Sequence, residues 1–252
     1  MTIDPGWPVA LALLVLLAVA LATHRLAGTG LTRSALTAAL RATVQLAVVA
    51  LVITAVVRSV WLSLLFCLVM FVLGVVTTAR RVEAPRAWPW AALAMAAGVL
   101  PVLVVVLATR TIPFSGIALI PVLGIIIGNA MSGHTLAGRR AFAALREERD
   151  QYDAALALGF LPRAAVLMIV HRRTPEALVP GLDQVRTTGL VTLPGAFIGV
   201  MLGGGSAVQA ATAQLLVLLG IMVAQTVTTA VEEQLIAARR LLPPDLTVSL
   251  HD

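Results

Sequence analysis

Apolar runs of about 20 residues recur along the chain, and short segments rich in arginine separate them. A helix of that length crosses the hydrocarbon core of a bilayer, and lipid requires each crossing segment to satisfy its own backbone hydrogen bonds. The composition agrees, because 60% of the 252 residues are hydrophobic and 12% are charged. Soluble domains have about 45–50% apolar and about 25% charged residues. The sequence therefore predicts an all-α, polytopic helical membrane protein.

The runs predict about seven transmembrane helices. The last follows the small loop Gly203–Ser206 and ends near Val231, and the apolar pattern of the sixth is broken by prolines, Asp183 and Arg186. The first six cover roughly Trp7–Leu26, Leu36–Val57, Val60–Thr78, Trp88–Ala108, Ile117–Ala137 and Gly181–Leu202.

All 18 basic residues are arginines, and they gather in alternate connections of the chain. Because cytoplasmic loops collect positive charge, this bias places the N-terminus outside and the C-terminus in the cytoplasm. The same bias explains the net charge of +6 without a nucleic-acid partner. Without lysine the chain has no Walker A loop, whose lysine binds nucleotide phosphates. It is therefore expected to be no enzyme, and any ATP hydrolysis must come from another subunit.

Small residues repeat every four positions in two of the expected spans. Gly124 and Gly128 form one such ridge, and Gly195, Gly199 and Gly203 form the other. Ridges of this kind let two helix backbones approach closely. The spacing fits packing within the chain and a subunit interface equally well.

The segment 139–175 between the fifth and sixth spans is expected in the cytoplasm, because its charged part, Arg139–Asp153, is too polar to enter lipid. It contains a short amphipathic helix that should end at Gly159, since glycine readily adopts the left-handed conformation found after helices. Such a helix can enter a groove on a partner, or it can lie along the membrane surface.

The residues of this helix resemble the EAA loop of ABC transporter permeases. Asp153-Ala154-Ala155 is followed by Gly159 and later by Ile169 at the spacing of that loop, with Asp153 in place of the usual glutamate. The segment Thr174–Leu182 is also similar to the stretch after the loop in such permeases.

A closer resemblance covers nearly the whole chain and points to FetB-like permeases, a bacterial ABC family associated with iron export whose plant relatives are linked to aluminium tolerance. Polar residues inside otherwise apolar helices make the matching patterns specific. They are Arg41–Leu46, Ile120–Met131, Leu156–Gly159 and Thr188–Gly195.

This resemblance implies a single permease domain, residues 1–252, in the bacterial inner membrane. It implies a homodimer that exports iron, another metal ion or a metal-linked small solute. ATP and magnesium would bind to a separate FetA-like ATPase subunit, so this chain needs no cofactor of its own. The residues that would couple to the ATPase are Asp153, Ala154, Ala155, Leu158 and Gly159.

Polar groups inside the spans are candidates for the transport pathway, because burying them in lipid is costly unless they pair or face water. Asp183 and Arg186 can also neutralise each other within one helix. The histidines are scattered, and Glu232 and Glu233 are expected at a solvated interface, so no metal site is assigned. The pathway candidates are Gln45, Asn129, Met131, Asp183, Gln184, Arg186, Thr188 and Thr192.

Two alternatives remain open. The EAA-like loop also fits an ABC importer of methionine type, which would need an external binding protein. A channel or secondary transporter independent of ATP would use the Asp153 helix only as a membrane-surface helix.

Overall fold

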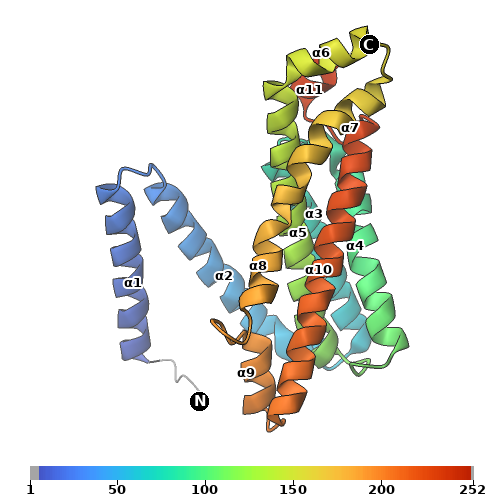
Figure 1. Cartoon of the computed structure of the whole chain (residues 1–252). Helices are drawn as coiled ribbons and strands as arrows, with labels where there is room; N and C mark the ends of the chain where they lie inside the picture. Colours follow the sequence, from blue (N-terminus) through green and yellow to red (C-terminus); the bar gives the residue numbers. More distant parts are fainter. Residues whose placement is uncertain (1–5, 251–252) are drawn as a thin grey trace. The chain divides into compact units, whose positions relative to one another are not determined.

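The computed structural model describes residues 6–250, and within this range it is helical without a β-strand. The chain divides into two compact units, residues 1–58 and 59–252 (Figure 1). Each unit is described by itself.

The first unit is a helical hairpin of α1 (Trp7–Leu26) and α2 (Thr32–Val56). Both helices are strongly apolar and long enough to cross a bilayer. None of the residues of α1 is buried within the chain. Apolar helices with so little cover are stable where lipid or another protein surrounds them.

Three long helices, α3 (Val60–Arg81), α5 (Gly116–Glu147) and α10 (Ala207–Ala237), run parallel in the second unit. The direction follows from their contacts. In α3, Gly74 lies beside Ile127 and Thr78 is hydrogen-bonded to His134, so both helices advance together. The helix α4 (Trp88–Ala108) runs the opposite way, since its beginning contacts the end of α10.

The helices α4 and α10 pack closely together at Gly98. A Cβ atom at Gly98 would collide with the Thr228 hydroxyl and the Ala224 carbonyl oxygen of α10. Glycine is therefore needed here because the two backbones approach more closely than a side chain allows.

The fifth helix is longer than the sequence predicts. It was expected over Ile117–Ala137, but α5 continues unbroken to Glu147, which gives 32 residues and a length of about 48 Å at 1.5 Å per residue. The added turns are stable because Ala141, Phe142 and Leu145 are buried against neighbouring helices. The charged segment thus begins as a rigid extension of a membrane helix.

Beyond α5 the chain folds back through two short helices, α6 (Arg149–Ala157) and α7 (Pro162–Arg173), and α11 (Pro244–Ser249) lies at the same end (Figure 1). We call this end of the second unit the α6 end. The helix α7 stops before Pro175, which lies in the short 3-10 helix η2 (Thr174–Ala177).

The expected sixth span is not one helix. It consists of α8 (Val179–Thr187) and α9 (Gly195–Leu202), separated by an irregular segment with a bridge between Thr188 and Thr192. Because α5 and α10 are parallel, the chain has to return between them, and α8 and α9 make this return beside α10 (Figure 1). Among the described residues, six continuous helices can cross a membrane by length and composition. The polytopic helical class is confirmed with six candidate spans, and a broken helix, α8 with α9, stands where the sixth span was expected.

The two glycine ridges have different surroundings. A Cβ atom at Gly124 would lie 2.9 Å from the Cε atom of Met70 in α3. At Gly128, Gly195 and Gly199 it would meet nothing within 4 Å, whereas Gly203 lies against the backbone of its own turn. Only the Gly124 position packs directly on another helix of the described chain.

Candidate functional site

The helix α6 presents a small exposed tip at its C-terminal end. It ends before Gly159, whose φ of +86° is the left-handed conformation that glycine adopts most easily. The side chains of Leu158 and Leu161 are 79% and 75% exposed, and Phe160 is also exposed. Three large apolar side chains clustered at a polar end of the protein form a surface suited to a protein partner.

The opposite face of α6 holds the helix in place. Tyr152 and Ala155 are buried, whereas Asp153 and Ala154 are exposed. Asp153 accepts a hydrogen bond from Arg149 at 3.1 Å, one helical turn away. Of the expected coupling residues, Ala155 therefore faces the protein interior and the others are accessible. The apolar tip extends past Gly159, further than the sequence pattern indicates.

Glu148 ties the start of α6 to the end of α7. It lies at the junction between α5 and α6, and its carboxylate accepts hydrogen bonds from Arg172 and Arg173 at 3.4 and 3.1 Å. The Glu148 side chain is only 14% exposed, so these pairs are better shielded from water than ordinary surface ion pairs. Glu148 therefore joins α5, α6 and α7 at one point.

Contacts to the end of α10 hold α7 as well. The Glu233 carboxylate lies 2.8 Å from Nδ1 of His171 and accepts a hydrogen bond from the Thr174 hydroxyl at 2.7 Å. Arg163 donates to the side chain of Gln234 at 2.7 Å. These bonds connect the α6–α7 segment to a helix that spans the whole unit.

A buried polar cluster lies deeper between α3, α5 and α10. The His134 ring nitrogen Nδ1 is 3.0 Å from the Thr78 hydroxyl and 3.4 Å from a carboxyl oxygen of Glu232. The Thr78 hydroxyl is also 2.8 Å from that of Thr135. His134 and Glu232 have no exposed surface, and neither carboxyl oxygen of Glu232 forms a hydrogen bond to a described residue.

The expectation that Glu232 and Glu233 lie at a solvated interface is wrong, because both are buried. The reason is that α10 continues to Ala237, so this part of the helix still packs against α5 and α7. A signal was present in the sequence. Gln225, Thr229 and Glu232 recur at steps of four and three, which places them along one face of a helix.

The pathway candidates fall into separate places. Asn129 donates to the Ile125 carbonyl of its own helix at 2.9 Å, and its backbone oxygen accepts from Gln225 of α10 at 3.3 Å. Met131 is half-buried on α5. A Cβ atom at Gly181 of α8 would collide with the Gln225 side chain, which therefore lies between α5 and α8.

Most other candidates lie on α8 or in the break after it. Asp183 and Arg186 are exposed and form an ion pair of 3.2 Å, as their spacing allows. Thr188 donates to the Gln184 carbonyl at 2.7 Å, and the Thr192 carbonyl accepts from Gly189 at 2.8 Å. These polar groups therefore stabilise the broken helix locally. Gln45 is exposed on α2, in the first unit.

Comparison with known proteins bears on these sites. Residues 7–241 match the uncharacterised protein family UPF0014, which is almost the whole chain. The chain belongs to the UPF0014 family. The family match covers α1 to α10, so it includes α6 and the buried polar cluster.

Several relatives of this UPF0014 chain have names that describe a role. It is 34% identical to the UPF0014 membrane protein STAR2 of Oryza sativa subsp. japonica over 225 residues, covering 88% of this chain and 78% of the relative. It is 31% identical to the protein ALUMINUM SENSITIVE 3 of Arabidopsis thaliana, over 68% of this chain and 62% of the relative. It is 32% identical to the probable iron export permease protein FetB of Escherichia coli (strain K12), over 50% of this chain and 48% of the relative. The similarity to a FetB-like permease is thereby confirmed.

No solved structure gives a significant match to the UPF0014 chain. Within residues 6–250 there is also no group of three or more His, Cys, Asp or Glu side chains placed to hold a metal ion. His251 lies outside the described residues.

Proposed function

We propose that this UPF0014 chain is the permease subunit of an ABC transporter that exports iron, another metal ion or a metal-linked small solute. The observation that carries the proposal is the α6 tip. Leu158 and Leu161 are exposed at the end of a short helix whose other face is anchored through Tyr152. An apolar tip on a rigid base can enter a groove on a partner subunit and move with it.

The partner would be a FetA-like ATPase that binds ATP and magnesium. This chain contains no lysine, so it cannot provide the lysine of a Walker A loop. The name of the E. coli relative supports a permease role. In this proposal, ATP-driven closure of two ATPase subunits moves α6.

Movement of α6 can reach the membrane by two routes. The first is α5, which continues from the junction at Glu148 into the bilayer as one helix. The second runs through the ion pairs of Glu148 with Arg172 and Arg173 to α7, and from there to α8. The break between α8 and α9 gives the second route a point at which the helix can bend.

The cargo route in this proposal passes the polar groups of the broken helix and of the facing helices. These groups are Asn129, Met131, Asp183, Gln184, Arg186, Thr188 and Thr192. Gln45 on α2 is a separate candidate within the first unit. A broken helix can present backbone carbonyl oxygens to a cation where it lines a cavity. Such ligands hold a metal weakly enough to release it.

The proposed assembly is a homodimer in the bacterial inner membrane, with residues 1–252 as one permease domain. The arginine bias puts the α6 end in the cytoplasm, where it can contact the ATPase. The N-terminus is then outside, and α8 with α9 completes the seventh crossing.

Co-purification with the ATPase encoded beside this gene tests the proposal. The variant Leu158→Asp with Leu161→Asp places two charges on the α6 tip and should abolish ATPase retention. The control is Leu26→Asp with Leu31→Asp, at residues that are 89% and 53% exposed at the connection between α1 and α2. It makes the same chemical change at a distance in sequence and should retain the ATPase.

The outcomes separate the possible functions. Loss of the ATPase from the tip variant alone supports the coupling role of α6. If the folded wild-type chain also fails to retain the ATPase, a channel or secondary transporter independent of ATP is favoured.

A further inference from the structure

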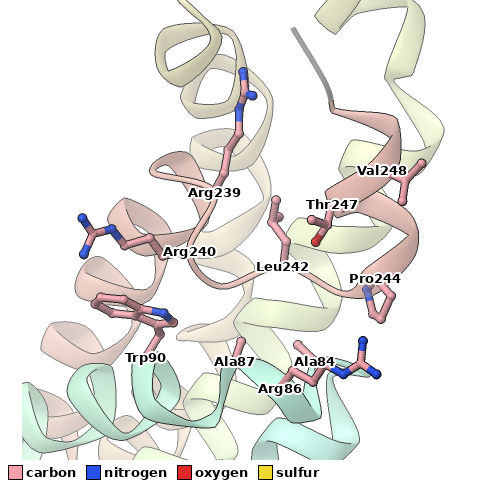
Figure 2. Close-up of a pocket in the computed structure, with 10 residues that line it drawn as sticks. All are labelled: Ala84, Arg86, Ala87, Trp90, Arg239, Arg240, Leu242, Pro244, Thr247 and Val248. Carbon is pink, nitrogen blue, oxygen red and sulfur yellow. The ribbon is translucent and has the colours of Figure 1, made fainter.

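A basic cavity opens at the α6 end, away from the α6 tip. It has a volume of about 430 Å³ and lies between the start of α4, the turn after α10, and α11. Its floor includes the buried residues Ala84, Ala87 and Leu242. Figure 2 shows Arg240 beside Trp90 on one side of this floor and Arg86 on the other side.

The lining of the cavity is positively charged. It includes Arg86, Arg239 and Arg240, and no aspartate or glutamate is among its residues. The nearby carboxylates Glu83 and Asp245 both bind Arg146, at 3.1 and 2.7 Å. In the part of the chain that the structure describes, Arg86 and Arg240 form no ion pair, so their charges are available to an anion.

The fold positions Arg240 for this role. The helix α10 ends in a Schellman turn, with Arg239 at φ +56° and the Arg240 amide donating to the Leu235 carbonyl at 2.9 Å. The turn brings the Arg240 guanidinium over the Trp90 ring, 4.6 Å from its centroid. Stacking on an aromatic ring orients the guanidinium and leaves its N–H groups free to donate.

The depth of the cavity relative to the membrane indicates the source of its ligand. Arg86 and Trp90 lie in the first turns of a segment, Pro85–Ala108, that is long and apolar enough to cross a membrane. Tryptophan and arginine at such a position occupy the headgroup region of the bilayer. A basic rim above an apolar floor matches a phosphate group attached to an acyl glycerol.

We propose that this cavity binds the phosphate group of an anionic phospholipid, with Arg240 beside Trp90 as its principal donor and Arg86 adding positive charge on the opposite side. Guanidinium groups suit this ligand because they form charge-assisted, bidentate hydrogen bonds to phosphate. The inference is independent of the proposed transport function.

Binding to the purified full-length chain in a mild neutral detergent tests the proposal. The protein is titrated with phosphatidylglycerol, with phosphatidylcholine of the same acyl chains, and with inorganic phosphate. Native mass spectrometry counts the bound molecules. Phosphatidylglycerol should bind at least tenfold more tightly than phosphatidylcholine. The variant Arg86→Gln with Arg240→Gln should remove this difference.

A matched control has the same loss of charge elsewhere. Arg33→Gln with Arg80→Gln changes two exposed arginines that do not line the cavity, and it should keep the wild-type preference. Helix content by circular dichroism checks that each variant is folded. In addition, Trp90→Leu should weaken phosphatidylglycerol binding by a few-fold, because it removes the ring beneath Arg240.

Two results would overturn the lipid proposal. One is equal affinity of the wild type for phosphatidylglycerol and phosphatidylcholine. The other is an equal loss of the phosphatidylglycerol preference in the cavity double variant and in the control double variant. If inorganic phosphate instead binds with the same dependence on Arg86 and Arg240, the phosphate site stands and its ligand is a soluble phosphate compound.

Discussion

Nδ1 of His134 lies 3.4 Å from a carboxyl oxygen of Glu232, and both side chains are fully enclosed between helices. An isolated charge in such a place costs several kcal/mol. The two groups must therefore be charged together, as imidazolium and carboxylate, or neutral together. In both states the pair joins α5 to α10, and α5 is the helix that continues to the start of α6.

A double-mutant cycle of His134→Leu and Glu232→Gln should reveal strong coupling. We expect an interaction free energy of about 1–3 kcal/mol, since the two side chains are enclosed within 3.4 Å of each other and neighbouring residues in one polar cluster do not act independently. Thermal unfolding of the purified chain in detergent, followed by circular dichroism, provides the measurement.

The pair His171 and Glu233 is the control for this cycle. Its Nδ1–Oε1 distance is shorter, 2.8 Å, but the His171 side chain is 76% exposed. Water weakens such a pair, so its coupling should stay below about 1 kcal/mol. Coupling that is equal in the two pairs would show that burial does not determine the strength of the first.

The variant Gly98→Ala tests the contact between α4 and α10. A methyl group there would collide with Thr228 and with the backbone of Ala224, and we expect a loss of about 1–3 kcal/mol from overpacking. Gly128→Ala is the matched helical control, because nothing lies within 4 Å of its Cβ position. It should be neutral or stabilise the helix by up to about 1 kcal/mol. Equal melting temperatures of the two variants would contradict the close approach.

Asp245 should make stability depend on pH. Its hydrogen bonds from Arg146 lower the pKa of the Asp245 carboxyl. A lowered pKa in the folded state gives stability that is present above the ordinary pKa and is lost as the pH falls through the lowered value. The side chain is 54% exposed, so the contribution should be at most about 1 kcal/mol.

Melting temperatures of wild type and Asp245→Asn, compared between neutral and acidic pH, check this expectation. At neutral pH the wild type should have a higher melting temperature than Asp245→Asn, and this difference between the two proteins should shrink at acidic pH. Asp150→Asn is the control, because Asp150 is exposed and forms no ion pair within residues 6–250. A difference that persists in acid would exclude the carboxylate as its source.

Helix positions follow well from the sequence, because a bilayer requires long apolar segments. The broken helix was harder to recognise. The residues of α8 and α9 together make one apolar length, and only Asp183, Arg186 and the prolines interrupt it. Periodicity cannot show that the backbone leaves the helix at Thr188, since that depends on the local hydrogen bonds of Thr188 and Gly189.

The buried polar cluster could not be assembled from the sequence. His134 and Glu232 are far apart along the chain, and their contact depends on the parallel register of α5 and α10. By contrast, the end of α6 at Gly159 was predictable, because it depends on one residue and its neighbours. Local signals were therefore sufficient for α6, whereas contacts between helices required the structure.

The variant Gly199→Leu tests whether the proposed homodimer uses the second glycine ridge. Gly199 is exposed and lines an apolar cavity of about 700 Å³ between α5, α9 and α10. No atom lies within 4 Å of its Cβ position, so a leucine should leave the melting temperature of the single chain nearly unchanged. If a second copy packs here, the variant should shift dimer to monomer in size-exclusion chromatography with light scattering.

The control for Gly199→Leu is Gly124→Leu. A side chain there would press on Met70 of the same chain, so this variant should lower the free energy of unfolding by about 1–3 kcal/mol, as overpacking does. The two variants thus separate a contact between copies from a contact within one copy. A dimer that persists with Gly199→Leu would place the interface elsewhere, and the uncovered apolar faces of α1 and α2 would be the next to test.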